Sequence, residues 1–136
     1  MSVVGYLWAF PCTLIGLLIG LLGLATGGRA QLVEGVVEFW GGLIAWLLRR
    51  VPLIGGAEAM TIGHVVLGQT FISLELTRRH EHVHVRQYER WGILFFIIYF
   101  GLMPWLWWKG AHPYFDHPFE VEAFREADQT DQGDFV

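Results

Sequence analysis

The chain has 136 residues, about the length of one domain, of which 54% are hydrophobic and only 16% are charged. Soluble globular domains average about a quarter charged residues, so this composition points to lipid contact and argues against a disordered chain. The formal net charge of -4 argues against a nucleic-acid partner. Cys12 is the single cysteine, which excludes an intramolecular disulfide and leaves histidine and carboxylate side chains as the ligands of any metal.

The first predicted element is a transmembrane segment in residues 1–28. Residues 2–28 carry no charged side chain, and the stretch is longer than the ~20 residues that a helix needs to cross a bilayer. A cleaved signal peptide is the alternative, but no basic region precedes the apolar run, so we expect the segment to be retained. Pro11 lacks a backbone N–H, and the helix therefore either starts near Cys12 or is kinked there.

A small sheet is predicted after this segment. Residues 29–50 contain an apolar stretch too short to span a bilayer, which fits an interfacial helix or a pair of strands. Gly41 and Gly42, which follow an alternating pattern, favour a strand and a turn. Residues 59–76 are rich in Thr, Ile, Val and Phe and predict one or two strands.

Residues 92–108 form a second apolar run, which ends in tryptophans and Lys109, as is typical of a membrane interface. Gly101 and Pro104 lie inside this run, which either crosses the bilayer or breaks there, so that the chain re-enters the lipid and returns.

The acidic tail holds seven of the 13 acidic residues, and Pro118 predicts the start of a short helix. The sequence thus divides into a transmembrane segment (1–28), a membrane-embedded domain (29–128) and a frayed acidic end (129–136).

The sharpest chemical signal is the motif HEHVH at residues 80–84, in a segment whose composition predicts a helix from about Thr77. His80 and His84 are four residues apart, so on a helix they share one face and can bind one ion. Glu81 lies about 100° further round the helix, where its carboxylate can reach a water on that ion and act as general base.

Two further features accompany the motif. Gln87 lies three residues after His84 and falls on the same helix face, and the segment FEVEAF places Glu120 on the predicted downstream helix. Two imidazoles and one carboxylate are a typical zinc ligand set that leaves a position open for water. The candidate Zn²⁺ ligands are therefore His80, His84 and Glu120, with Glu122 as the reserve for the third.

The pattern HExxHxxQ followed by PFExEA resembles the gluzincin type of zinc metallopeptidase, in which a glutamate on a second helix is the third ligand. The resemblance covers residues 74–128 and implies an α+β, membrane-associated minimal zincin-like fold: a small sheet, an active-site helix and a C-terminal helix. It also implies that part of residues 60–76 is an edge strand that pairs with extended substrate. Phe124 stands where the family commonly has an Asp that supports a ligand histidine, so that support must come from elsewhere.

The metal hypothesis constrains the topology, because a fully crossing 92–108 segment would place the two histidines and Glu120 on opposite sides of the membrane. We therefore expect the zinc near the headgroups, with a peptide or a membrane protein as substrate. Eight of the nine Lys and Arg residues lie between Arg29 and Lys109, which favours a cytoplasmic catalytic part. The expected location is the plasma membrane of a prokaryote, in contact with membrane lipid.

Other functions fit the same residues. A non-catalytic metal-binding membrane subunit or assembly factor would keep the ligands without turnover. A membrane di-iron oxygenase ranks behind, because such enzymes typically use about eight histidines and the chain has six. The motif also fits a solvated charged helix face. His82 points away from the predicted ligands, and we interpret it as a surface residue or a contact with lipid headgroups.

Overall fold

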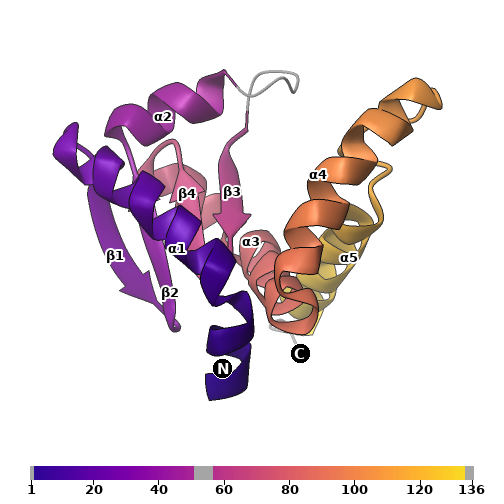
Figure 1. The fold of residues 1–136 in the computed structure, drawn as a ribbon, viewed down its shortest axis with the longest axis horizontal. Coiled ribbons are helices and arrows are strands. Elements are labelled where there is room, and N and C mark those ends of the chain that lie inside the picture. Colours follow the sequence, from indigo (N-terminus) through magenta and orange to yellow (C-terminus); the bar gives the residue numbers. More distant parts are fainter. Residues whose placement is uncertain (1, 51–56, 134–136) are drawn as a thin grey trace.

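The computed structural model describes residues 2–50 and 57–133, which form an α+β fold of five helices and one four-stranded sheet (Figure 1). This confirms the predicted class and the predicted order of N-terminal helix, small sheet, long helix and C-terminal helix. The elements in chain order are α1 (Val3–Ala25), β1 (Arg29–Val33), β2 (Val36–Trp40), α2 (Gly42–Arg49), β3 (Ala59–Ile62), β4 (Val65–Gly68), α3 (Phe71–Trp91), α4 (Ile93–Trp108) and α5 (Pro118–Gly133).

The sheet has the strand order β1-β2-β4-β3. β1 and β2 form an antiparallel hairpin whose turn residues, Glu34 and Gly35, both have positive φ, as a tight hairpin turn requires. β2 pairs with β4 in parallel, and β3 pairs with β4 in the antiparallel direction. Among the described strands, β3 is therefore an edge strand, and it is the edge on the side of α4 and α5 (Figure 1).

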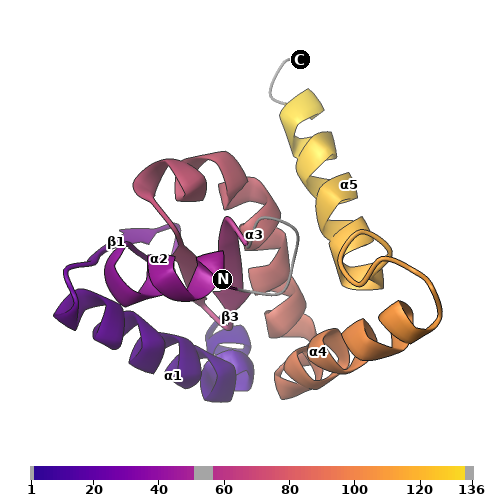
Figure 2. The ribbon, with the colours of Figure 1, turned by 90° about the horizontal axis from the view of Figure 1, so that it is seen from above.

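Helices cover both faces of the sheet (Figure 2). Phe39 and Val65 pack in one cluster with residues of α1 and α2, whereas Val66 packs on the other face with Leu74 and Val85 of α3. Apolar residues on β2 and β4 thus point to both faces, which is typical of a strand buried on both sides.

The turn between α3 and α4 occurs at Gly92, where the two helix axes are bent by 116°. Gly92 has φ +61°, and a Cβ at this position would lie 2.6 Å from the indole nitrogen of Trp8, so the turn requires glycine. α4 continues without interruption through Gly101 and Pro104. The break expected at those two residues is therefore absent, and the chain reverses at Gly92 and again after α4.

Helix boundaries also differ from the sequence prediction. α1 begins directly after Ser2, whose hydroxyl accepts a backbone hydrogen bond, and it continues through Pro11. The alternative start near Cys12 is therefore wrong, whereas the alternative of a kinked helix is not contradicted, and Figure 1 shows the N-terminal part of α1 at an angle to the rest. α3 begins directly after Thr70, which caps it in the same way, rather than near Thr77. α5 reaches Gly133, beyond the predicted start of fraying.

α1 is the one described helix that is long and apolar enough by itself to cross a membrane.

A buried ion pair joins the sheet to α3. Glu38 of β2 is fully buried and accepts hydrogen bonds from Arg78 Nε at 3.1 Å, Arg78 Nη2 at 2.9 Å and Gln31 Nε2 at 2.8 Å. Burial raises the pKa of Glu38, but the neighbouring His82, 3.6 Å away, and the hydrogen bonds from Arg78 and Gln31 outweigh it and lower this pKa to about 2. His82 is itself buried between Glu34 and Glu38, so its predicted surface position is wrong.

We predict that Arg78→Ala lowers the free energy of unfolding by on the order of 3 kcal/mol, because it leaves a buried carboxylate without its cation. Denaturant unfolding in detergent would measure the change. The matched control is Arg86→Ala on the same helix, which removes an exposed ion pair with Glu126 and should cost less than about 1 kcal/mol. Equal losses in the two variants would contradict the role of the Glu38–Arg78 pair.

Candidate metal centre

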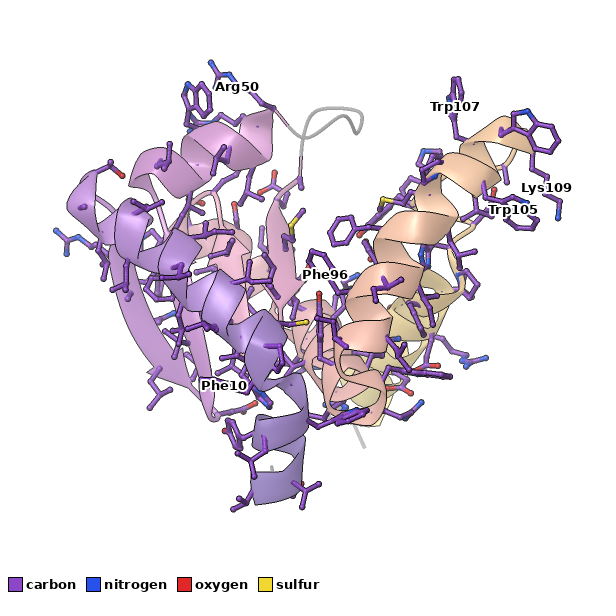
Figure 3. All side chains as sticks on the ribbon, viewed as in Figure 1. Phe10, Arg50, Phe96, Trp105, Trp107 and Lys109 are labelled. Carbon is purple, nitrogen blue, oxygen red and sulfur yellow. The ribbon has the colours of Figure 1, made fainter. Side chains whose placement is uncertain are left out.

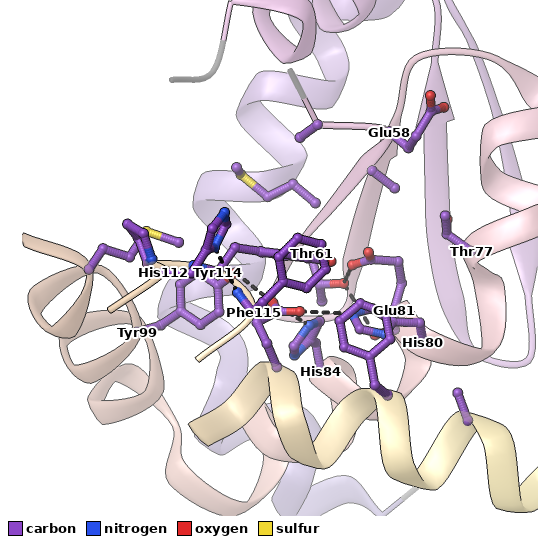
Figure 4. A pocket seen from close by; sticks show the side chains of 18 of the residues that line it. Glu58, Thr61, Thr77, His80, Glu81, His84, Tyr99, His112, Tyr114 and Phe115 are labelled. Carbon is purple, nitrogen blue, oxygen red and sulfur yellow. Dashed lines mark hydrogen bonds and ion pairs between the residues drawn. The ribbon is translucent and has the colours of Figure 1, made fainter. Parts of the chain in front are cut away.

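The structure brings His80 and His84 of α3 together with Glu120 of α5 (Figure 4). His80 Nε2 lies 2.9 Å from Glu120 Oε2, and His84 Nε2 lies 2.8 Å from Glu120 Oε1. The candidate ligand atoms are all within 4.8 Å of one another. His84 and Glu120 are buried, and 12% of the His80 side chain is exposed. Three side chains predicted from separate segments therefore form one cluster.

The first turn of α5 holds Glu120 in place. Pro118 is the first residue of the helix, where its missing N–H costs nothing. The Nδ1 atom of His117 accepts a hydrogen bond from Phe119 N at 3.2 Å, and its Nε2 donates to the Tyr99 carbonyl at 2.9 Å. The hydroxyl of Tyr99 donates to Glu120 Oε1 at 2.6 Å. α4 thus orients both the start of α5 and the carboxylate.

Gln87 determines how His84 is presented to the site. The amide nitrogen of Gln87 donates to the Phe119 carbonyl at 3.1 Å and to Glu122 Oε1 at 3.2 Å. Its amide oxygen therefore faces His84 Nδ1, at 2.7 Å. An acceptor at this distance keeps the proton of neutral His84 on Nδ1, and the lone pair of Nε2 then points toward Glu120.

The charges of the cluster balance one another. Burial alone would raise the pKa of Glu120, but the hydrogen bonds from His80 and His84 hold it well below its usual range. Burial likewise lowers the pKa of His84, but the hydrogen bond and charge of Glu120 outweigh this and raise it to about 9. Without an ion the cluster therefore pairs a carboxylate with an imidazolium, and a divalent cation would replace that proton.

The residues fit a zinc ion. Two imidazole nitrogens and one carboxylate oxygen are a ligand set that zinc prefers, and Glu120 forms ion pairs with both histidines. His80 Nδ1 has no hydrogen-bond partner in the described part of the chain. The ring of Phe124, which stands where the gluzincin pattern has an Asp, instead lies 4.3 Å from the His80 ring.

Glu81 lies beside the cluster, on the side of β3 (Figure 4). Its side chain is buried, and its Oε2 accepts a hydrogen bond from the Thr61 hydroxyl at 2.7 Å. Thr61 belongs to the edge strand β3, so the sheet positions the candidate base. Glu81, His80 and His84 all border a cavity of about 1130 Å³ between β3 and α4.

The reserve ligand Glu122 lies apart from the three ligand atoms. Its carboxylate contacts Gln87 and, at 3.6 Å, Arg90 Nη1. Three residues that contact the site were not predicted: Tyr99, Thr61 and Tyr114, the last of which lies between α4 and α5 and borders the cavity. Tyr99 lies within the apolar run 92–108. A polar hydroxyl in such a run is unusual, and this could have marked Tyr99 as a candidate site residue. Thr61 lies in a strand that offers no local signal.

Comparisons of the chain with protein-family models, with curated proteins and with solved structures find no match.

We predict that the purified protein binds about one zinc ion per chain, the stoichiometry of a single four-coordinate site. Glu120→Gln should lose most of this zinc, because an amide replaces the charged ligand, whereas Glu122→Gln should retain it. Elemental mass spectrometry after purification without chelators would measure both variants. Equal zinc loss in the two variants, or zinc loss in Glu122→Gln alone, would contradict Glu120 as the third ligand.

Zinc binding should also displace a proton from His84. Below its pKa of about 9 this imidazole is protonated in the ion-free protein, so rising pH removes the competing proton. The apparent zinc affinity should rise about tenfold per pH unit as pH 9 is approached from neutral pH, and should level off above it. Competition with a chelator of known pH dependence would measure this slope, and an affinity independent of pH would contradict it.

Proposed function

We propose that the protein is a membrane-bound zinc metallopeptidase with a minimal zincin-like fold, in which His80, His84 and Glu120 hold Zn²⁺. The observation that supports this most is the His₂Glu cluster beside a buried glutamate, all of which border one large cavity. A structural zinc site would use a fourth protein ligand, whereas three ligands beside a cavity leave room for water and substrate.

The roles of the chain's own residues follow from their contacts. Zinc held by His80, His84 and Glu120 would supply an acidic water and would polarise a substrate carbonyl. Glu81 takes the proton of the attacking water and gives it to the leaving amine. The Thr61 hydroxyl occupies Glu81 Oε2, which leaves the other carboxylate oxygen for the water. Burial and the charge of Glu120 raise the pKa of Tyr114, so its hydroxyl stays protonated and can donate to a developing oxyanion.

The cavity favours an extended polypeptide with large apolar side chains. Its two long walls are the edge strand β3 and the helix α4, which contributes Phe100, Met103 and Trp107. An edge strand offers unpaired backbone N–H and C=O groups to a peptide, while the apolar wall accepts its side chains. Membrane proteins and their juxtamembrane segments carry such sequences, and we propose them as substrates.

The alternative is a non-catalytic metal-binding membrane subunit. The unpartnered Nδ1 of His80 favours it, because ligand histidines in metal sites are usually oriented by a hydrogen bond at the second nitrogen. Both functions require the same three ligands, so only turnover separates them.

We predict that Glu81→Gln lowers peptidase turnover by about a hundredfold or more, the usual contribution of a general base, and leaves zinc content unchanged. Zinc-loaded protein in detergent would be assayed with quenched fluorescent peptides that carry large apolar residues. The control is Glu126→Gln, an exposed carboxyl on α5 that does not border the cavity.

Unchanged turnover in Glu81→Gln would contradict its role as base. A parent protein that binds zinc but cleaves none of the peptides would support the non-catalytic alternative.

A further inference from the structure

α1 packs against the folded domain along most of its length. Its buried residues are small and recur on one side of the helix: Gly5, Ala9, Cys12, Gly16, Gly20 and Gly23. A Cβ at Gly16 would meet Val65 of β4, and one at Gly20 would meet Phe39 of β2. Small residues allow this close approach of the helix to the sheet. One side of α1 is therefore covered by protein, with the sheet directly beside it.

The opposite side of α1 is apolar and exposed. Leu7, Phe10, Leu14, Leu18 and Leu21 follow a helical repeat, and each is 45–69% exposed. Transfer of these side chains from water to hydrocarbon is favourable, since about half of each is exposed. Soluble monomers rarely expose apolar surface of this extent.

α4 presents a second exposed apolar side. Leu94, Ile97, Trp105 and Trp108 lie at helical spacing and are 48–81% exposed, whereas the other side of α4 borders the cavity. Figure 2 shows α1 and α4 along the same side of the molecule, and neither helix contains a charged residue. We call these exposed side chains together the apolar face. It consists of Leu7, Phe10, Leu14, Leu18 and Leu21 of α1 and of Leu94, Ile97, Trp105 and Trp108 of α4.

Cations paired with tryptophans lie at the margin of this face (Figure 3). Arg50 stacks over the ring of Trp46 at 3.9 Å, and Lys109 lies 4.6 Å from the ring centre of Trp105. Tryptophan beside a cation is typical of the headgroup level of a bilayer, where the ring enters the apolar region and the cation meets phosphate. The chemistry of the margin therefore favours a lipid leaflet as the partner of the apolar face.

The sheet beside α1 argues against a helix that crosses the bilayer. If α1 stood upright in the membrane, the strands packed on it would lie at the depth of the hydrocarbon, together with the exposed Arg29 of the edge strand β1. The unpaired backbone N–H and C=O groups of that edge would find no hydrogen-bond partner in lipid, which makes this placement unfavourable. A helix that lies in the plane of the membrane buries its apolar side and keeps the sheet outside the hydrocarbon.

We propose that the protein is monotopic: α1 and α4 lie in one leaflet through the apolar face, and α1 does not cross the membrane. Both ends of α1 are then on the same side as the candidate metal centre. This proposal does not depend on zinc binding or peptidase activity. The lipid beside α4 is separated from the cavity by the width of that one helix.

Cysteine labelling in oriented membranes tests the proposal. In a Cys12→Ser background, Ser2→Cys and Arg29→Cys place a thiol at each end of α1, and Leu18→Cys and Ile97→Cys place one within the apolar face. Each variant is expressed in bacterial membranes and treated with a membrane-impermeant maleimide in spheroplasts and in inverted vesicles. The background without added cysteine is the control, and an unchanged melting transition in detergent shows that each variant folds.

The two end cysteines should react in the same preparation, and the two face cysteines should react only after detergent is added. End cysteines that react in different preparations would show that α1 crosses, and would overturn the proposal. So would end cysteines that react in neither preparation. Face cysteines that react without detergent, or that form disulfide-linked dimers, would show water or a second copy of the chain at the face, which also overturns it.

Discussion

A buried carboxylate must be neutralised, and Glu120 meets this constraint through two histidines that come from 40 and 36 residues earlier in the chain. The segment between them leaves α3 at Gly92, runs along α4, and turns back so that the first turn of α5 faces the middle of α3. Two hydrogen bonds hold the later part of this path: the hydroxyl of Tyr99 on α4 binds the carboxylate, and His117 joins α4 to the start of α5. The arrangement of the C-terminal half therefore depends on how Glu120 is satisfied.

The sequence predicts those features of the fold that depend only on the spacing of residues along one helix. The four-residue interval of HEHVH places His80 and His84 on one helix face, and the structure shows both beside Glu120. The turn at Gly92 was not predicted, because its two requirements for glycine, a positive φ and the close approach of the indole of Trp8 on α1, are seen only in the structure. For the same reason Gly101 and Pro104 proved misleading: a proline inside a helix is tolerated where the surrounding contacts favour the helix.

The burial and the contacts of polar residues are less predictable from the sequence than those of apolar residues, because they depend on partners that are distant in sequence. His82 has the charged neighbours of a surface residue, yet it is buried by the hairpin residues Glu34 and Glu38. Gln87 was placed correctly on the ligand face, but only the structure shows that its amide nitrogen is held by α5 and that its oxygen therefore faces His84. Thr61 contacts Glu81 across 20 residues of sequence, and no local pattern indicates that pairing.

The two walls of the cavity each hold one of the two carboxylates on which the proposed chemistry depends. Thr61 of β3 positions Glu81, and Tyr99 of α4 positions Glu120. Interiors are close-packed and transmit small displacements, so a ligand that separated β3 from α4 would strain the hydrogen bonds of Thr61 and Tyr99 to the two carboxylates. The hydrogen bonds of the walls thus couple occupancy of the cavity to the geometry of the site. A substrate that fills the space without forcing the walls apart leaves both carboxylates in place, and this favours a narrow, extended chain over a bulky folded one.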